Sequence, residues 1–248
     1  MKRLITVALM LGALTAVGQE LKKVVKKHSS NPFTNEREEY EVLSDDKKVR
    51  HGLYKKWVND KLTEEGYYKN NKKDSIWTRY SGQTILNIGN YANDEKVGIW
   101  EYYINAIELE QEYDFTKKAL VSFKPPRKNI IYQIINDKDT LFAPLSRPPL
   151  IIGGQYAYLE KVAKNLRYPI EAMRNNISGT VFVRFMIDET GKTSDFKVVN
   201  TRNKSLDREA LRVVKLIDDW LPAIKDGKPV KVIHVVPIIF AKDGIVNR

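Results

Sequence analysis

Apolar and polar residues alternate in regular patterns over the last hundred residues of the chain. Apolar residues recur at helical spacing over residues 157–166 and 170–175, and again after Ser205, which is a good N-cap residue. Alternation predicts a strand over residues 180–187, and a turn at residues 188–192, with Gly191, leads into a second strand through 196–198. Residues 230–240 are predicted to close the domain as a long strand. The predicted order is helix, helix, strand, strand, helix, strand, so this part of the chain is expected to be a small sheet packed by helices, within an α+β fold.

A second pattern, a repeat of 23 residues, covers residues 46–115. The positions that recur are Gly52, Ser75 and Gly98; Leu53, Ile76 and Ile99; Tyr54, Trp77 and Trp100; Trp57, Tyr80 and Tyr103; Gly66 and Gly89; and Tyr68 and Tyr91, with Tyr113 beginning a degraded third copy. Repetition at a fixed period indicates stacked units that bury their apolar faces on one another. Short alternating runs between Asn, Asp, Lys and Gly turns predict that each unit is a β-hairpin.

The repeat pattern, G-x-W-x-x-Y followed by a G-x-Y strand, resembles the MORN-like repeats of bacterial antitoxin-type and envelope proteins, in three copies. The aromatic side chains allow two interpretations. They could form a recognition surface for a peptide or a glycan, or they could be the core of a small all-β ribbon. Packing is favoured, because no other residues in the segment could form a core. We therefore assign no site to the repeats.

The first eighteen residues have the pattern of a signal peptide. Lys2 and Arg3 precede an apolar stretch at residues 4–17, and Ala16 and Gly18 are the small residues that a signal peptidase reads. The alternative is a retained inner-membrane anchor facing the periplasm, although fourteen helical residues would span only about 21 Å. A basic polar segment follows at residues 19–45, and no cysteine is present for a lipid anchor or a disulfide.

Residues 116–148 have a different composition from the repeats. Half of the ten prolines of the chain lie at positions 125–149, around one β-prone run at residues 130–135. The segment is predicted to be a semi-rigid, proline-containing linker that carries at most one strand. The C-terminal domain is expected to occupy residues 149–248.

A group of short motifs in the C-terminal third resembles the C-terminal domain of TonB energy transducers. The matching runs, in order, are Gly153-Gly154, Asn165-Leu166-Arg167-Tyr168-Pro169, Ala172, Ile177 to Phe185, Asp188, Gly191, Leu206 to Ala210, Trp220 to Ala223, Gly227 to Val230 and Pro237 to Phe240. The resemblance covers residues 149–240. It implies a periplasmic, non-enzymatic module for outer-membrane transport that binds the TonB box, a short peptide of outer-membrane receptors. Where an inner-membrane helix is retained, the resemblance also implies coupling to a proton-driven motor complex.

The last strand offers a physical basis for such binding. It is apolar on both faces, and Pro237 cannot donate to a ladder, which is typical of an edge strand. An extended peptide could pair with this edge by strand addition. The expected contact residues are Asn165, Tyr168, Lys231, Val232, Ile233, His234, Val235 and Val236. The alternative is that Tyr168-Pro169 only stops a helix and that the apolar strand is core or a dimer interface, so a homodimer stays open.

Other classes of function receive little support from the sequence. The histidines, His28, His51 and His234, stand far apart, and Asp218-Asp219 beside Trp220 resembles a solvated pair more than a catalytic dyad. We therefore expect no enzyme activity, no catalytic or metal-binding residue and no cofactor. The formal net charge is +11, but no aromatic-basic motif accompanies it, so nucleic acid is not an expected partner. The serious alternative to a transport protein is an envelope scaffold or immunity-type protein that binds through the repeats.

Overall fold

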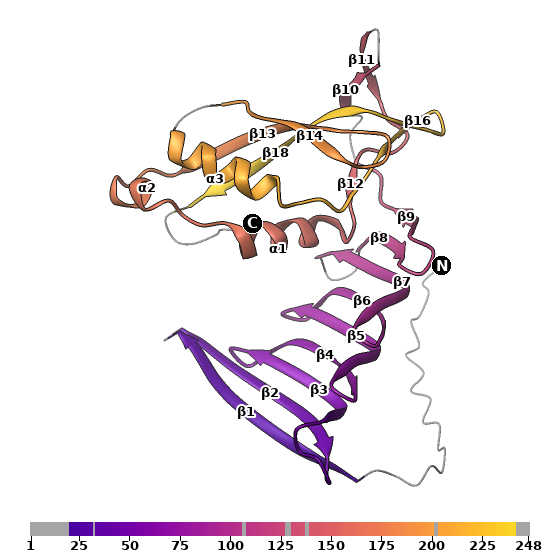
Figure 1. The fold of residues 1–248 in the computed structure, drawn as a ribbon, viewed down its shortest axis with the longest axis vertical. Coiled ribbons are helices and arrows are strands. Elements are labelled where there is room, and N and C mark those ends of the chain that lie inside the picture. The colour runs from indigo at the N-terminus through magenta and orange to yellow at the C-terminus, as the bar shows by residue number, and fades with distance from the viewer. Residues whose placement is uncertain are drawn as a thin grey trace.

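The protein folds into two large antiparallel sheets, with two further pairs of short strands, and helix α1 (Gly154–Asn165) lies between the large sheets (Figure 1). The computed structural model describes residues 20–31, 33–105, 108–126, 130–136, 139–200 and 203–241. The first sheet contains strands only, and the second is packed by helices, so the predicted α+β class is confirmed. The predicted signal peptide lies outside the described residues. Within the described segments, no helix is both long enough and apolar enough to span a membrane.

The first sheet is a meander in which each strand pairs with its neighbours in sequence. Its strands are β1 (Leu21–Asn31), β2 (Thr34–Leu43), β3 (Arg50–Val58), β4 (Lys61–Lys69), β5 (Lys72–Ser81), β6 (Thr84–Ala92), β7 (Glu95–Ile104), β8 (Glu108–Asp114) and β9 (Ala119–Phe123). The hairpins predicted from the repeat are present, but the sheet begins within the predicted basic segment 19–45 and ends within the predicted linker 116–148. The many lysines of β1 obscure its apolar-polar alternation in the sequence. The strand pairs with β2, and ion pairs such as that between Lys23 and Glu39, at 2.6 Å, link the two strands.

Two glycines of the repeat let tryptophan rings lie flat against the neighbouring strand. A Cβ atom at Gly66 would overlap the ring of Trp77, and a Cβ atom at Gly89 would overlap the ring of Trp100. The indole nitrogen of Trp77 donates to Tyr67 O and that of Trp100 to Asn90 O, both at 3.0 Å. The two acceptors are 23 residues apart, as are the two tryptophans. The rings are 1% and 2% exposed, so they form a core and not an open surface.

Cations cover this aromatic core from the solvent side at the same 23-residue spacing. The Arg50 guanidinium lies 4.3 Å from the ring centroid of Tyr40, and the ammonium groups of Lys73 and Lys96 lie 3.7 and 4.1 Å from those of Trp77 and Trp100. Cations are attracted to the faces of aromatic rings, and the lysine stems shield apolar surface. The first sheet can therefore keep a core on one face although it is a single layer.

The repeat also explains an unusual backbone conformation. Gly52, Ser75 and Gly98 occupy equivalent positions and all have positive φ angles, at 112°, 59° and 62°. A side chain at such a φ is strained by its Cβ atom, whereas glycine is not. Ser75 therefore carries strain that its two counterparts avoid.

Replacing Ser75 should consequently stabilise the protein. We expect Ser75→Gly to raise the free energy of unfolding by about 0.5–1 kcal/mol, measured by urea denaturation of the full chain. The control is Ser81→Gly in the same strand, where φ is not positive; this change should lower the free energy of unfolding by a similar amount. A loss of stability in Ser75→Gly would contradict the strain argument.

The second sheet has the strand order β11-β10-β18-β13-β14 and is packed by helices on its inner face. Its elements are β10 (Ile131–Ile135), β11 (Thr140–Pro144), β13 (Gly179–Ile187), β14 (Thr193–Val198) and β18 (Val232–Phe240), with α1 (Gly154–Asn165), α2 (Ile170–Arg174) and α3 (Lys204–Val214). Short strands accompany them: β12 (Leu150–Ile151) pairs with β15 (Trp220–Leu221), and β16 (Ala223–Lys225) with β17 (Lys228–Val230).

Most of the predicted elements of this domain are observed, with some differences. The last strand, predicted over residues 230–240, begins at Val232, and Val230 belongs to β17. The helix N-cap is Asn203 and not Ser205, because the Asn203 side chain accepts hydrogen bonds from Ser205 N at 2.9 Å and Leu206 N at 3.2 Å. The predicted linker carries two strands of the second sheet, of which β10 corresponds to the β-prone run at residues 130–135. The proline-rich segment therefore contributes structure to the domain that follows it.

The two sheets meet at the start of α1. Gln111 of β8 is 2% exposed; its amide donates to Ile151 O at 3.1 Å and accepts from Gly153 N at 2.7 Å. The Glu110 carboxylate accepts from Gln155 N at 2.9 and 3.0 Å. The N-cap residue of α1, Gly153, has no side chain that could accept from the first N–H groups of the helix. Glu110 of the repeat sheet accepts from one of them instead. Burial raises the pKa of Glu110, and the hydrogen bond from Gln155 opposes that shift.

Candidate functional site

The predicted binding edge, β18, is paired on both sides over part of its length. It pairs with β13 from Val232 to Phe240. On its other side β10 covers only the beginning, where Gln133 and Ile134 lie opposite Ile233 and Val232 and Ile135 N donates to Lys231 O at 2.9 Å. The sequence predicts an edge strand here, and β18 is one only beyond Ile233. The early part of the predicted edge is already occupied by a strand of the same chain.

Backbone groups alternate in direction along an antiparallel strand, and this alternation identifies the free ones. Because Lys231 O accepts from β10, the odd-numbered residues of β18 direct their N–H and C=O groups away from β13. Beyond the part covered by β10, these are Val235, Pro237 and Ile239. The Pro237 oxygen accepts a long hydrogen bond of 3.4 Å from the Tyr158 hydroxyl of α1. The open stretch is therefore residues 235–239.

A pocket of about 220 Å³ adjoins the beginning of this open stretch. Its lining residues include His234 and Val236 of β18, Tyr158 of α1, and Phe123 and Lys124 at the end of the first sheet. The pocket thus has one wall from each sheet. An extended segment placed along residues 235–239 would have this pocket beside it, where it could receive a side chain.

His234 contributes an aromatic wall to the pocket. Its ring packs edge-on against Trp220 and Phe185, at centroid distances of 5.1 and 5.6 Å. Burial lowers the pKa of His234 to about 4, since the protonated ring would lose its hydration. His234 is therefore neutral at neutral pH and acts as an apolar packing residue.

The structure separates the two groups of predicted contact residues. Asn165, at the end of α1, donates from its side chain to Lys161 O at 2.8 Å, and the Tyr168 hydroxyl donates to Ile177 O at 2.6 Å. The Tyr168 ring lies edge-on to Phe240, at a centroid distance of 5.8 Å. Lys231 is nine residues before Phe240, about 30 Å along an extended strand. Tyr168 thus lies near the far end of β18, away from Lys231, Val232 and Ile233, whereas the recorded contacts of Asn165 are with Lys161 of α1 and Arg212 of α3.

Sequence reasoning missed three contributors to this region: β10, the Tyr158 hydroxyl and the wall supplied by β8 and β9. The β-prone run at residues 130–135 indicated a strand, but its partner lies a hundred residues further along the chain. Tyr158 could be placed on a helix from the sequence, yet not beside Pro237. No group of three or more histidine, aspartate and glutamate side chains suited to a metal ion occurs within the described residues.

The fold and this edge define a class of domain, a small sheet with helices on one face and a partly open strand. Residues 164–241 match the family model for the Gram-negative bacterial TonB protein C-terminal domain. No curated protein and no solved structure matches the chain. The family match spans 78 of the 248 residues, so it confirms the predicted resemblance for the C-terminal domain alone. The MORN-like assignment of residues 46–115 stays a prediction.

The low pKa of His234 predicts how stability depends on pH. An unfolded histidine titrates near 6.5, and folded His234 near 4, so only the unfolded chain binds this proton between those values. We expect the free energy of unfolding to fall by about 1–2 kcal/mol between about pH 7 and about pH 5. The measurement is urea denaturation at both pH values.

The variant His234→Phe should reduce this loss, because phenylalanine keeps the packing against Trp220 and Phe185 without a titrating group. The matched control is His51→Phe, at a histidine that contacts the edge of the Tyr67 ring on the first sheet. That variant makes the same exchange at a distance from His234 and leaves the His234 ring in place. An unchanged pH dependence in His234→Phe would show that other groups cause the acid destabilisation.

Proposed function

We propose that this chain is a periplasmic TonB-like protein that binds TonB-box peptides of outer-membrane receptors by adding them as a strand to residues 235–239 of β18. The family match supports a role in the bacterial envelope, and the apolar N-terminal stretch of the sequence supports export. Coupling to the motor complex would require that the N-terminal stretch is retained in the inner membrane.

The observation that carries the proposal is the pairing of β10 with β18. Residues 133–135 of the chain already lie along the beginning of this strand as an added strand. The next residues of the same edge present their backbone groups in the same direction and have no strand beside them in the described structure. A peptide of about five residues running antiparallel to β18 would continue the line of β10.

Neighbouring side chains suit such a peptide. Val235 and Ile239 on the outer face are 45% and 47% exposed, and they offer apolar contacts to an added strand. The Tyr158 hydroxyl makes only a long hydrogen bond to Pro237 O, so an incoming N–H group could replace it at small cost. Pro237 itself has no N–H group, which limits the number of hydrogen bonds and favours reversible binding.

The test is titration of the full chain with synthetic TonB-box peptides, followed by the backbone amide resonances of β18. We expect shifts at Val235 and Ile239 that exceed those at Ile233, which is paired with β10. Val235→Pro removes the N–H group that faces the open edge and leaves the ladder with β13 intact, so it should weaken binding at least tenfold. Val235→Thr keeps the N–H group and is the matched control.

A second candidate function, an envelope scaffold that binds through the repeats, is favoured by one observation. Leu53, Ile76 and Ile99 recur at the 23-residue spacing on the face opposite the aromatic core and are 58%, 58% and 46% exposed. The same titration separates the two functions. Shifts confined to residues 46–115, with β18 unaffected, would contradict the transport proposal and support the scaffold.

A further inference from the structure

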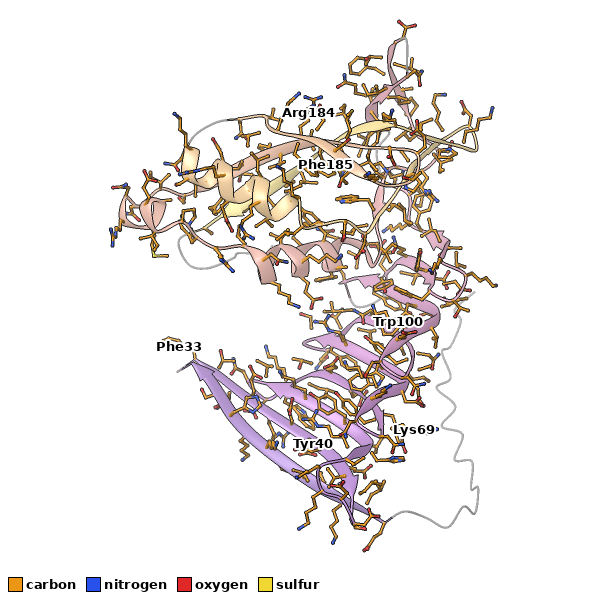
Figure 2. All side chains as sticks on the ribbon, viewed as in Figure 1. Phe33, Tyr40, Lys69, Trp100, Arg184 and Phe185 are labelled. Atoms are coloured by element: carbon orange, nitrogen blue, oxygen red, sulfur yellow. The ribbon has the colours of Figure 1, made fainter. Side chains whose placement is uncertain are left out.

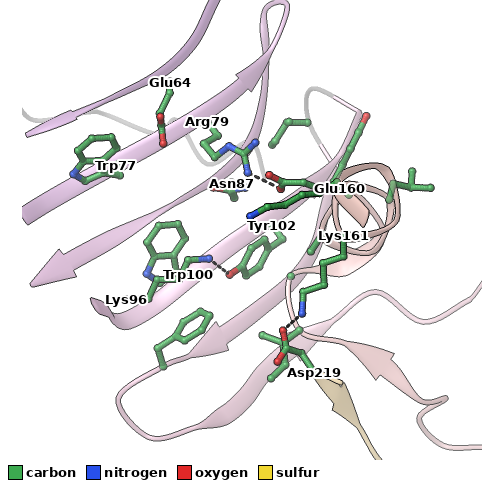
Figure 3. Close-up of a pocket in the computed structure, with 18 of the residues that line it drawn as sticks. Glu64, Trp77, Arg79, Asn87, Lys96, Trp100, Tyr102, Glu160, Lys161 and Asp219 are labelled. Atoms are coloured by element: carbon green, nitrogen blue, oxygen red, sulfur yellow. Dashed lines mark hydrogen bonds and ion pairs between the residues drawn. The ribbon is translucent and has the colours of Figure 1, made fainter. Parts of the chain in front are cut away.

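A wide cleft lies between the aromatic face of the first sheet and helix α1 (Figure 3). Its volume is about 590 Å³. Lys96, Trp100 and Tyr102 line it on the sheet side, and Glu160 and Lys161 line it on the helix side. Figure 2 shows side chains of the first sheet and of α1 directed into the space between them. This cleft is separate from the pocket beside β18, and no step of the proposed peptide binding uses it.

The carboxylates that line the cleft are all engaged by cations. Glu64 lies 2.7 Å from Lys73, Glu160 lies 2.7 Å from Arg79 across the cleft, and Asp219 is paired with Lys161. Two further cations line the cleft, Lys96 in the sheet and Lys164 at its rim on α1. Neither has an ion pair within the part of the chain that the structure describes.

Comparison of two repeats shows why Lys96 lacks a counter-ion. Lys73 and Lys96 are 23 residues apart, and each ammonium group lies over the tryptophan of its own repeat. Lys73 is paired with Glu64 on the neighbouring strand. The position equivalent to Glu64, 23 residues later, is Asn87. In place of a carboxylate, the Lys96 ammonium donates to the Tyr102 hydroxyl, at 3.1 Å.

Lys96 is half-buried, and an ammonium group without a counter-ion is costly in such a position. Burial, together with the positive charges of Arg79 and Lys73, lowers the pKa of Lys96 to about 8. Glu160 and Asp219, the acidic groups that face it from α1 and from the segment before β15, oppose this shift, but both are already paired. The cleft around Lys96 therefore attracts an anion.

We propose that the cleft binds a small organic carboxylate, whose anionic group occupies beside Lys96 the place that Glu64 occupies beside Lys73. Asn87 provides an amide that can donate to the second carboxylate oxygen. Leu86, Ile152 and Leu159 supply apolar walls for the body of the ligand, and the cleft volume is in the range of small-molecule sites. Lys164 at the rim adds a second positive charge along the entrance.

The test is calorimetric titration of the full chain with benzoate, with benzamide as the neutral probe of the same shape. We expect benzoate to bind and benzamide not to bind. Asn87→Glu restores the carboxylate of the repeat and should keep the chain folded, because the equivalent pair of Glu64 and Lys73 already exists. This variant should weaken benzoate binding at least tenfold, and Lys96→Met should abolish it.

The matched control is Asn90→Glu, which adds the same charge to the same strand on the opposite face. Its affinity for benzoate should equal that of the natural chain. Affinity should also fall as the pH rises above about 8, because Lys96 then loses its proton.

A parallel titration with N-acetylalanine identifies the source of the carboxylate. Tighter binding than that of benzoate assigns a peptide carboxylate, and weaker binding assigns a ring acid. Failure of both acids to bind, or equal benzoate binding by Asn87→Glu, would overturn the proposal.

Discussion

The contact between β8 and the start of α1 is the constraint on which the arrangement of this protein depends. Gln111 is almost fully buried and makes hydrogen bonds to backbone groups on both sides of the turn before α1. Glu110 beside it accepts from the first turn of the helix. A buried amide and a helix terminus both require partners, and here each satisfies the other. This contact sets the orientation of α1 on the repeat sheet and thereby forms both the cleft and the pocket.

The same contact gives the repeats a role beyond their own stability. Repeat sheets need their ends covered, because a terminal strand leaves an open edge and an open aromatic face. In this chain α1 lies over the last repeats, and Arg79 is tied to Glu160 of that helix. The C-terminal domain therefore covers part of the aromatic face of the last repeats. In return the repeat sheet supplies Phe123 and Lys124 beside β18, so the two units share the surroundings of the open edge.

How much the sequence could predict depended on the range of the interactions involved. The burial of Val181, Val183, Phe185 and Ile187 follows directly from alternation, and each is at most 1% exposed. Strand β1 was missed, because its lysines mask the alternation and find their partners only on β2. The pairing of β10 with β18 was missed as well, because the two strands are a hundred residues apart. The exchange of Glu64 for Asn87 is visible in the repeat, but its meaning depends on where Lys96 lies.

By itself the sequence determined the hairpin series, the order of elements in the C-terminal domain and the family that this domain matches, because alternation, turn residues and short motifs are local properties. Tertiary structure alone decided which part of β18 stays open, which cations keep a counter-ion and where cavities form. These properties result from contacts between distant segments. Apolar burial drives such contacts and is non-directional, so a local pattern does not show which segments will meet.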